Sequence, residues 1–277
     1  MTVALLAAAS LSADFNFSWE QEVTVPGSNE KYHFSVNDKD LRDAYEGKKQ
    51  EDYGIGKLTA PTAASVEKKE PDIANIRRLA EQGNALFQFQ LGRLYARGEG
   101  VEQDWAEAVK WYTLSAEKGN SKAQNNLGVI YRYDRQNIQR NYAKALYWLE
   151  QSAAQDNSYA FLNLGSMYQS GEGVTTDYKK AMEYYKKGEK AGAVQSNYCI
   201  AGLYMDGLGV PKNEKKAFSY FETGAKKGDV LCQYQTGIMY RDGIGTKKNV
   251  KQAEQWLSRA AANGDTKAAE ALRTLGN

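Results

Sequence analysis

Five consecutive segments of this chain repeat one pattern of residues, and this repetition constrains the fold more than any other feature. The segments begin at Asn84, Asn120, Asn157, Ala193 and Asp229. Each segment is 36 residues long except the second, which has 37. A period of roughly 20 to 50 residues is typical of stacked supersecondary units, because each unit buries its apolar face only against its neighbours. The period therefore predicts a solenoid over residues 84–264.

The first half of each repeat has the periodicity of a helix. Counted from the first residue of each repeat, position 9 is glycine or alanine in all five repeats and position 12 is always tyrosine. The tyrosines are Tyr95, Tyr131, Tyr168, Tyr204 and Tyr240. Positions 4, 8 and 12 lie on one face of a helix because they are four residues apart. The small residue at position 9 allows a neighbouring helix to approach closely.

A glycine-rich turn and a second helix complete the repeat. Residues 98–100, 171–173, 207–209 and 243–245 each read Gly-x-Gly, which suits a backbone with positive φ. The second helix carries alanine at position 25 and an aromatic residue at position 28, allowing for the extra residue of the second repeat. The alanine seats the crossing of the two helices, and the aromatic rings fill the space between repeats. Glycines close four of these second helices: Gly119, Gly192, Gly228 and Gly264.

These residues resemble the Sel-one-like repeat (SLR) family, which is related to the tetratricopeptide repeats. The family pattern A-x-x-x-L-G-x-x-Y-x-x-G-x-G-V, followed by A-x-x-W-Y and A-x-x-G, is met almost completely by the first, third and fourth repeats. The resemblance implies an all-α fold, a right-handed α-α superhelix (solenoid) of five SLR repeats. Half repeats at residues 72–83 and 265–275 look like its caps, so the predicted solenoid domain covers residues 72–277.

The predicted repeats therefore have definite bounds. They span residues 84–119, 120–156, 157–192, 193–228 and 229–264. Cys232 is at position 4, where other repeats have alanine or serine, so it is predicted to be a small buried core residue. Neighbouring helices run about 8–10 Å apart, whereas a disulfide needs Cα atoms within roughly 7 Å. We therefore expect Cys199 and Cys232 to be free thiols.

Residues 1–71 precede the repeats and differ from them in composition. Residues 1–13 are apolar and end in small side chains, like the hydrophobic part of a secretory signal, so a signal-like remnant and export are predicted. No Lys or Arg lies in this stretch. Either the true beginning lies upstream or the stretch is an ordinary apolar arm. The predicted location is periplasmic or secreted, with the cytoplasm as the alternative.

A β-hairpin is predicted within residues 14–59. Apolar and polar residues alternate from Phe15 to Val25 and again from Tyr32 to Val36, with a Pro-Gly-Ser-Asn turn between them. Residues 60–71 are a predicted linker. His33 lies on the polar face of the hairpin. It is interpreted either as a solvated strand residue or as a metal ligand or catalytic base, for which the sequence offers no partner residues.

Charge and composition exclude several functions. Residues 1–70 carry 8 basic and 12 acidic side chains and residues 71–277 carry 28 and 22, so the net charges are −4 and +6. The overall charge of +2 is too balanced for a general nucleic-acid binder. With one histidine, the chain cannot build a multi-histidine metal centre. Residues 54–57 (Gly-Ile-Gly-Lys) lack the spacing of a phosphate-binding loop. No cofactor, no metal and no enzymatic activity are therefore predicted.

Two regions are candidate partner-binding surfaces. The candidate residues of the first region lie on the first helices: Leu86, Phe89, Arg93, Tyr159, Leu162, Tyr198, Leu231, Tyr234, Arg241 and Asp242. Those of the second region lie in the second repeat: Arg132, Tyr133 and Arg135. At position 3 the chain has large apolar residues where the family has polar ones, which favours an interaction surface on a concave wall. At position 6, where an aromatic residue is ordinary for the family, core packing is the favoured interpretation and a partner-binding surface is the alternative. Residues 132–140 replace the glycine turn of the second repeat, either as a tolerated insertion or as a protruding Arg-Tyr loop that touches a partner.

The predicted function is that of a non-enzymatic protein-binding scaffold or adaptor. The resemblance implies exported bacterial roles of this kind, including immunity proteins that neutralise a toxic effector. The expected partner is another protein, bound in a concave groove. The chain is expected to be a monomer, to have no membrane span and to bind no nucleic acid. The alternative is a carbohydrate-binding or enzyme-accessory module of an envelope assembly, because a tyrosine-rich groove can also stack sugar rings.

Overall fold

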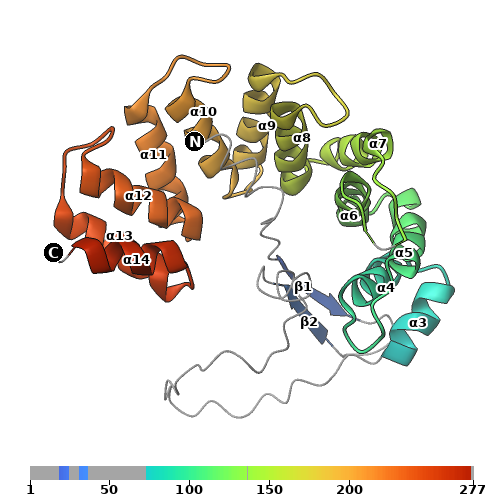
Figure 1. The fold of residues 1–277 in the computed structure, drawn as a ribbon. Helices are drawn as coiled ribbons and strands as arrows, with labels where there is room; N and C mark the ends of the chain where they lie inside the picture. Colours follow the sequence, from blue (N-terminus) through green and yellow to red (C-terminus); the bar gives the residue numbers. More distant parts are fainter. Residues whose placement is uncertain (1–18, 25–30, 37–72, 136, 276–277) are drawn as a thin grey trace, which may run out of the picture. The chain divides into compact units, whose positions relative to one another are not determined.

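A computed structural model of the chain describes residues 19–24, 31–36, 73–135 and 137–275. From residue 73 onward the described chain is helical apart from turns (Figure 1). The helices are α3 (Ile73–Glu81), α4 (Ala85–Arg97), α5 (Trp105–Glu117), α6 (Ser121–Arg132), α7 (Tyr142–Ala153), α8 (Ser158–Ser170), α9 (Tyr178–Lys190), α10 (Ser196–Asp206), α11 (Glu214–Lys226), α12 (Val230–Asp242), α13 (Val250–Ala262) and α14 (Thr266–Leu275). The prediction of tandem helix pairs is confirmed, with α3 and α14 as single helices at the two ends. The handedness of the array stays a prediction.

Local signals in the sequence set where the first helices begin and end. The side-chain oxygen of Asn157 accepts hydrogen bonds from the backbone amides of Tyr159 and Ala160, at 3.1 and 3.2 Å, and so caps α8. Gly171 ends the same helix with a φ of 72°, the left-handed conformation that glycine adopts at low cost. The fourth repeat has Ala193 at its first position, which cannot cap. Its first helix, α10, begins only at Ser196 and has no side-chain cap.

The small residues at position 9 are sites of close helix approach, as predicted. A Cβ atom on Gly165 in α8 would lie 2.6 Å from the ring of Tyr185 in α9. A Cβ atom on Gly92 in α4 would lie 2.8 Å from the ring of Tyr112 in α5. Both distances are too short for a real side chain, so glycine lets the first helix of a repeat rest directly on an aromatic ring of the second.

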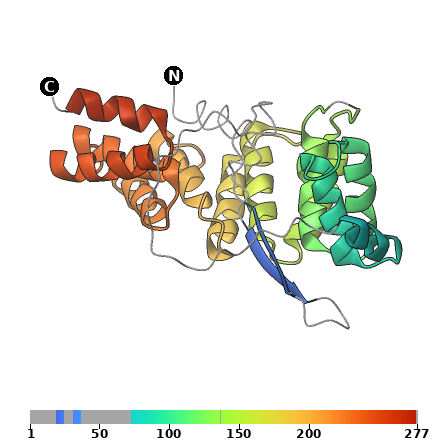
Figure 2. The same ribbon diagram turned by 90° about the horizontal axis from the view of Figure 1, so that it is seen from below.

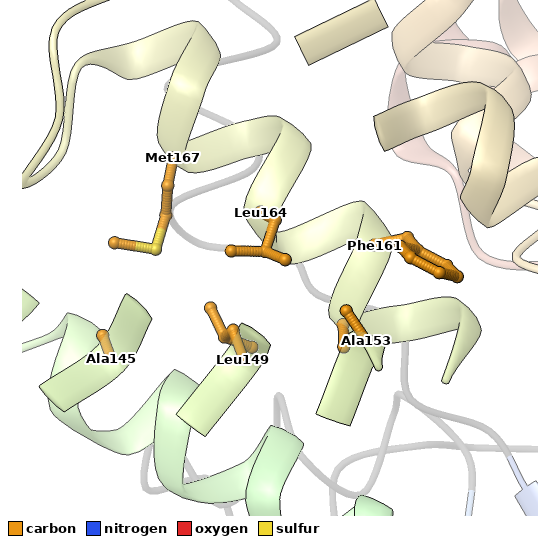
Figure 3. Close-up of a cluster of buried hydrophobic side chains, with 7 residues drawn as sticks. Ala145, Leu149, Ala153, Phe161, Leu164 and Met167 are labelled. Carbon is orange, nitrogen blue, oxygen red and sulfur yellow. The ribbon is translucent and has the colours of Figure 1, made fainter. Parts of the chain in front are cut away.

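Successive repeats share apolar cores. Between α7 and α8, the side chains of Ala145, Leu149 and Ala153 face Phe161, Leu164 and Met167, and all are buried (Figure 3). At the C-terminal end, α12, α13 and α14 lie side by side (Figure 2). Their buried core consists of Leu257, Ala260, Ala268 and Ala271. The hydrophobic effect therefore stabilises the contacts between successive repeats as well as the packing within each repeat.

The chain divides into two compact bodies, and the boundary lies within the second repeat. Among the described residues, the N-terminal body contains the chain up to Ala123 together with Arg135 to Ile138, and the C-terminal body contains residues 124–134 and 139–275. The domain bounds derived from the sequence stay a prediction.

Two strands lie in the N-terminal part of the chain. Strand β1 (Trp19–Thr24) pairs antiparallel with β2 (Lys31–Val36), with Trp19 opposite Val36 and Thr24 opposite Lys31. The rest of the predicted hairpin, the signal-like stretch and the linker lie outside the described residues. The hairpin appendage as a whole therefore stays a prediction.

Candidate functional site

The predicted surface at position 3 consists of three half-buried apolar side chains on first helices. Tyr159 lies in α8 and Leu231 in α12, both in the C-terminal body, while Leu86 lies in α4 of the N-terminal body. All three follow the cap residue by two positions, so they share one place in the first turn. Each of them leaves part of an apolar side chain at the surface.

At position 6, the structure corrects part of the sequence-based assignment. Phe89 and Leu162 are each 1% exposed and Tyr198 is 7% exposed. The ring of Phe89 packs 5.7 Å from that of Tyr112, and the ring of Tyr198 packs 5.5 Å from that of Phe221. These side chains fill the space between the two helices of a repeat and have almost no surface to offer a partner. Core packing, the interpretation favoured from the sequence at this position, accounts for them, and their assignment to a partner-binding surface is wrong.

Tyr234, the fourth aromatic or apolar residue at position 6, differs from the others. It is half-buried and packs on the edge of the C-terminal core formed by α12, α13 and α14. Burial raises the pKa of its hydroxyl, and the nearby carboxylate of Asp265 raises it further. Tyr234 therefore stays protonated and neutral near pH 7. It remains in the candidate surface.

The charged residues predicted around this surface are paired within the protein. Arg93 is 8% exposed and lies 3.7 Å from Glu99, which also binds Arg97 at 3.0 Å. Arg241 donates two hydrogen bonds to Asp242, at 2.7 and 2.8 Å. Those bonds lower the pKa of the Asp242 carboxyl group. Only the Arg241–Asp242 pair is at the surface, so it is the part of the predicted rim that a partner can reach.

Arg132 is not part of an exposed loop, which corrects the prediction. It is the last residue of α6, is 2% exposed, and its Nε and Nη2 atoms donate to the two carboxylate oxygens of Glu172 at 2.5 and 3.0 Å. Nη2 also donates to the hydroxyl of Ser166 at 2.8 Å. Burial opposes the charge of Arg132, but the hydrogen bond and charge of Glu172 outweigh it and raise the pKa of the guanidinium. This ion pair joins the second repeat to the third.

The segment that follows Arg132 is held against the protein rather than presented as a free arm. The guanidinium of Arg135 lies 4.2 Å from the ring centre of Trp105, the first residue of α5. Arg135 and Ile138 exchange backbone hydrogen bonds of 2.9 and 3.0 Å. Tyr133 is half-buried, and its ring lies 5.3 Å from the guanidinium of Arg132. The predicted contact of these residues with a partner is therefore less favoured than an internal role.

The same place in the other repeats shows what this segment replaces. In repeats with a glycine turn, the second glycine packs against the first residue of the preceding second helix. Gly173 meets Tyr142 in this way, and Gly209 meets Tyr178. The second repeat has no glycine here, and the Arg135–Trp105 cation–π contact occupies the equivalent place. The sequence places a tryptophan, Trp105, at the start of α5. Its contact with Arg135 can be recognised only in the folded chain, where the helices are stacked.

Both cysteines are free and buried, with Cys199 3% exposed and Cys232 0% exposed. Burial raises the pKa of the Cys199 thiol to about 12 and that of Cys232 well above its usual range. The thiolate is the reactive form, and a raised pKa removes it near neutral pH. We therefore expect neither thiol to react with iodoacetamide at pH 8 in the native protein and both to react in urea, as read by intact mass. Fast labelling of the native protein, or a Cys199–Cys232 bridge under non-reducing conditions, would contradict this.

The described residues contain neither a group of metal-ligating side chains nor a helix that could cross a membrane. Within 19–24, 31–36, 73–135 and 137–275, no group of three His, Cys, Asp or Glu side chains is placed to hold a metal ion. In the same residues, no helix has both the length and the apolar character needed to cross a bilayer.

Comparison with known proteins decides the family. The Sel1 repeat profile matches residues 85–120, 121–157, 158–192, 195–229 and 230–265, which is more than half of the chain. The chain belongs to the Sel1 repeat family. The matched segments follow the helix pairs α4–α5 to α12–α13. The resemblance recognised from the sequence is confirmed.

Solved Sel1 repeat proteins have the same fold. A protective antigen of uropathogenic Escherichia coli, c5321, is 36% identical with a TM-score of 0.64, over 71% of this chain and 42% of its own. A Sel1 repeat protein of Oxalobacter formigenes is 32% identical with a TM-score of 0.63, over 69% of this chain and 76% of its own. The immunity protein PA5088 of Pseudomonas aeruginosa is 17% identical with a TM-score of 0.54 and shares the fold, over 82% of each chain.

A curated relative matches over a shorter stretch. The putative sel1-like repeat-containing protein L21 of Acanthamoeba polyphaga mimivirus is 40% identical over 73 residues, which are 26% of this chain and 13% of that protein. The chain thus spans less than half the length of this Sel1 relative and of c5321. The repeats are what these proteins have in common.

Proposed function

We propose that this Sel1 repeat protein is a non-enzymatic scaffold that binds another protein through the exposed side of its first helices. The observation that carries the proposal is the half-buried apolar side chain at position 3, above all Tyr159 in α8. Large aromatic side chains at a surface are where binding energy concentrates in protein interfaces. In the C-terminal body, Leu231, Tyr234 and the Arg241–Asp242 pair of α12 complete the candidate surface.

The finer role in this proposal is that of an exported, monomeric immunity protein that neutralises a toxic effector. Its support is the fold shared with PA5088, which is described as an immunity protein. The apolar stretch of residues 1–13 supports export. The direct test is to co-produce a candidate effector with this protein in a sensitive cell, where rescue of growth by the wild-type chain is the expected result.

Substitution of Tyr159 by alanine tests the binding surface. We expect the variant to bind the partner captured by the wild-type chain about 30-fold more weakly, which corresponds to the loss of an interface hot spot of about 2 kcal/mol. The melting temperature should change little, because the side chain is only half-buried. The measurement is titration calorimetry with the partner isolated by pull-down from the source cell.

A matched control separates binding from general loss of an aromatic side chain. Tyr147 in α7 is 55% exposed, lies on a second helix, and should tolerate alanine without loss of binding. If Tyr159→Ala lowers the melting temperature by several degrees and leaves binding intact, position 3 belongs to the core and the proposal fails. The carbohydrate-binding alternative predicts retention on a glycan array, with no protein captured.

A further inference from the structure

The positive charge of the repeats is concentrated on two neighbouring second helices. Residues 178–190, which form α9, and residues 212–227, which contain α11, carry ten lysines, four glutamates and no arginine. Their net charge is +6, equal to the whole excess of residues 71–277, where 28 basic residues face 22 acidic ones. The rest of that range is balanced, with 18 of each. The small charge of the full chain therefore conceals a local patch.

The lysines lie on the outward face of these helices. The buried residues of α9 include Ala181 and Tyr185, and those of α11 include Ala217 and Phe221, which hold the same positions in their repeats. Both helices pack on α10 (Figure 1). The lysines are on the other side and recur in register, at positions 23, 24 and 34 of both repeats: Lys179 and Lys215, Lys180 and Lys216, Lys190 and Lys226. We call this surface the lysine face.

Half of these lysines form neither an ion pair nor a contact with an aromatic ring within the described part of the chain, whereas Lys180, Lys187 and Lys216 lie over tyrosine rings. The lysines without such contacts are Lys179, Lys186, Lys190, Lys215 and Lys227, all of which are exposed. Lys212 and Lys226 form ion pairs with Glu214 and Glu222, at 3.1 and 2.8 Å. Like charges four residues apart on a helix, such as Lys186 and Lys190, repel each other and weaken it. An external anion would relieve that repulsion.

The face has no large apolar side chain that is fully exposed. Within the described residues, the exposed large apolar side chains are Leu114, Tyr147 and Val250, and none lies in α9 or α11. The tyrosines nearest to the lysines are engaged internally: Tyr184 stacks on Tyr168 at 5.5 Å, and Tyr220 stacks on Tyr204 at 5.9 Å. Lysine is depleted in protein interfaces, where arginine and aromatic residues are enriched. Charge is therefore the main attraction that this face offers to a ligand.

The presence of lysine and the absence of arginine on this face favour one kind of anionic ligand over another. Arginine makes the bidentate contacts that read bases and fix phosphates in nucleic-acid complexes, and this face has none. The ammonium group of lysine is a compact point charge on a flexible stem, which suits headgroups that move laterally to meet it. We propose that the lysine face binds the surface of a lipid bilayer that carries anionic phospholipid headgroups. This proposal does not depend on the protein-binding function proposed above.

Vesicle co-sedimentation tests the proposal with the full chain. We expect binding to vesicles of 30% phosphatidylglycerol in phosphatidylcholine at low salt, no binding to pure phosphatidylcholine, and release at 0.5 M salt, where exposed charges are screened. The variant with Lys179, Lys186 and Lys190 all changed to Gln should partition about 100-fold less, because each lysine near an anionic surface contributes about fivefold. Glutamine keeps the helix propensity and removes only the charge.

The control variant carries the same loss of charge elsewhere. Lys247, Lys248 and Lys251 are exposed at the start of α13 and before it, and their change to Gln should leave partitioning nearly unchanged. Equal partitioning of wild type and the α9 variant, or no binding to anionic vesicles, would overturn the proposal. The proposal would also be overturned if the protein bound a 20-base-pair DNA duplex instead of vesicles and if the α9 variant lost that DNA binding. Tyr159→Ala should not affect vesicle binding, which distinguishes this face from the protein-binding surface.

Discussion

Replacement of Arg132 by alanine is expected to lower the free energy of unfolding by about 3–5 kcal/mol, the usual cost of removing one partner of a buried ion pair. The guanidinium is 2% exposed and holds Glu172 by two hydrogen bonds. Without it, the Glu172 carboxylate loses its cation and Ser166 loses a donor. Urea unfolding followed by circular dichroism measures the change.

An exposed arginine from the same segment is the matched control. Arg140 lies 3.9 Å from Asp134, and its side chain is 51% exposed. Its change to alanine should cost less than about 1 kcal/mol, because water screens an exposed ion pair. If the two variants unfold at the same urea concentration, Arg132 does not stabilise the junction between the second and third repeats.

Replacement of Gly245 by alanine is expected to cost about 3 kcal/mol of unfolding free energy, the sum of backbone strain and overpacking. Gly245 has a φ of 67°, and a Cβ atom there would overlap the backbone carbonyl of Glu214, the first residue of α11. Backbone cannot move aside as a flexible side chain can. The turn therefore has to shift away from α11, and the contact between repeats has to open.

Gly264 gives a control that isolates the steric part of this cost. Its φ is 92°, but a Cβ atom there would meet nothing within 4 Å. Gly264→Ala should therefore cost only about 1 kcal/mol, from backbone strain alone. Thermal melting of both variants gives the comparison. Equal losses would show that the glycine turn serves only the local backbone and not the packing of one repeat on the next.

The candidate site was only partly predictable from the sequence. The sequence predicts a binding surface at position 3 because Tyr159 and Leu231 depart from the family pattern there. In the structure both side chains are partly at the surface. Position 6 was ambiguous, because an apolar residue every few positions serves a core and an interface equally well. The packing of Phe89 on Tyr112 resolves that ambiguity. The net charge of +2 does not reveal the lysine face, because it averages over the whole chain.

The repeat length, the helix pairs and the helix ends follow from the amino-acid sequence alone. Those features depend on preferences within one or two turns of chain, such as an Asn157 cap or a Gly171 stop. The ion pair of Arg132 with Glu172, 40 residues away, and the contact of Arg135 with Trp105 become apparent only in the folded chain. Such contacts join residues that meet only after neighbouring repeats stack. Their geometry follows from the packing of whole helices and leaves no period in the sequence.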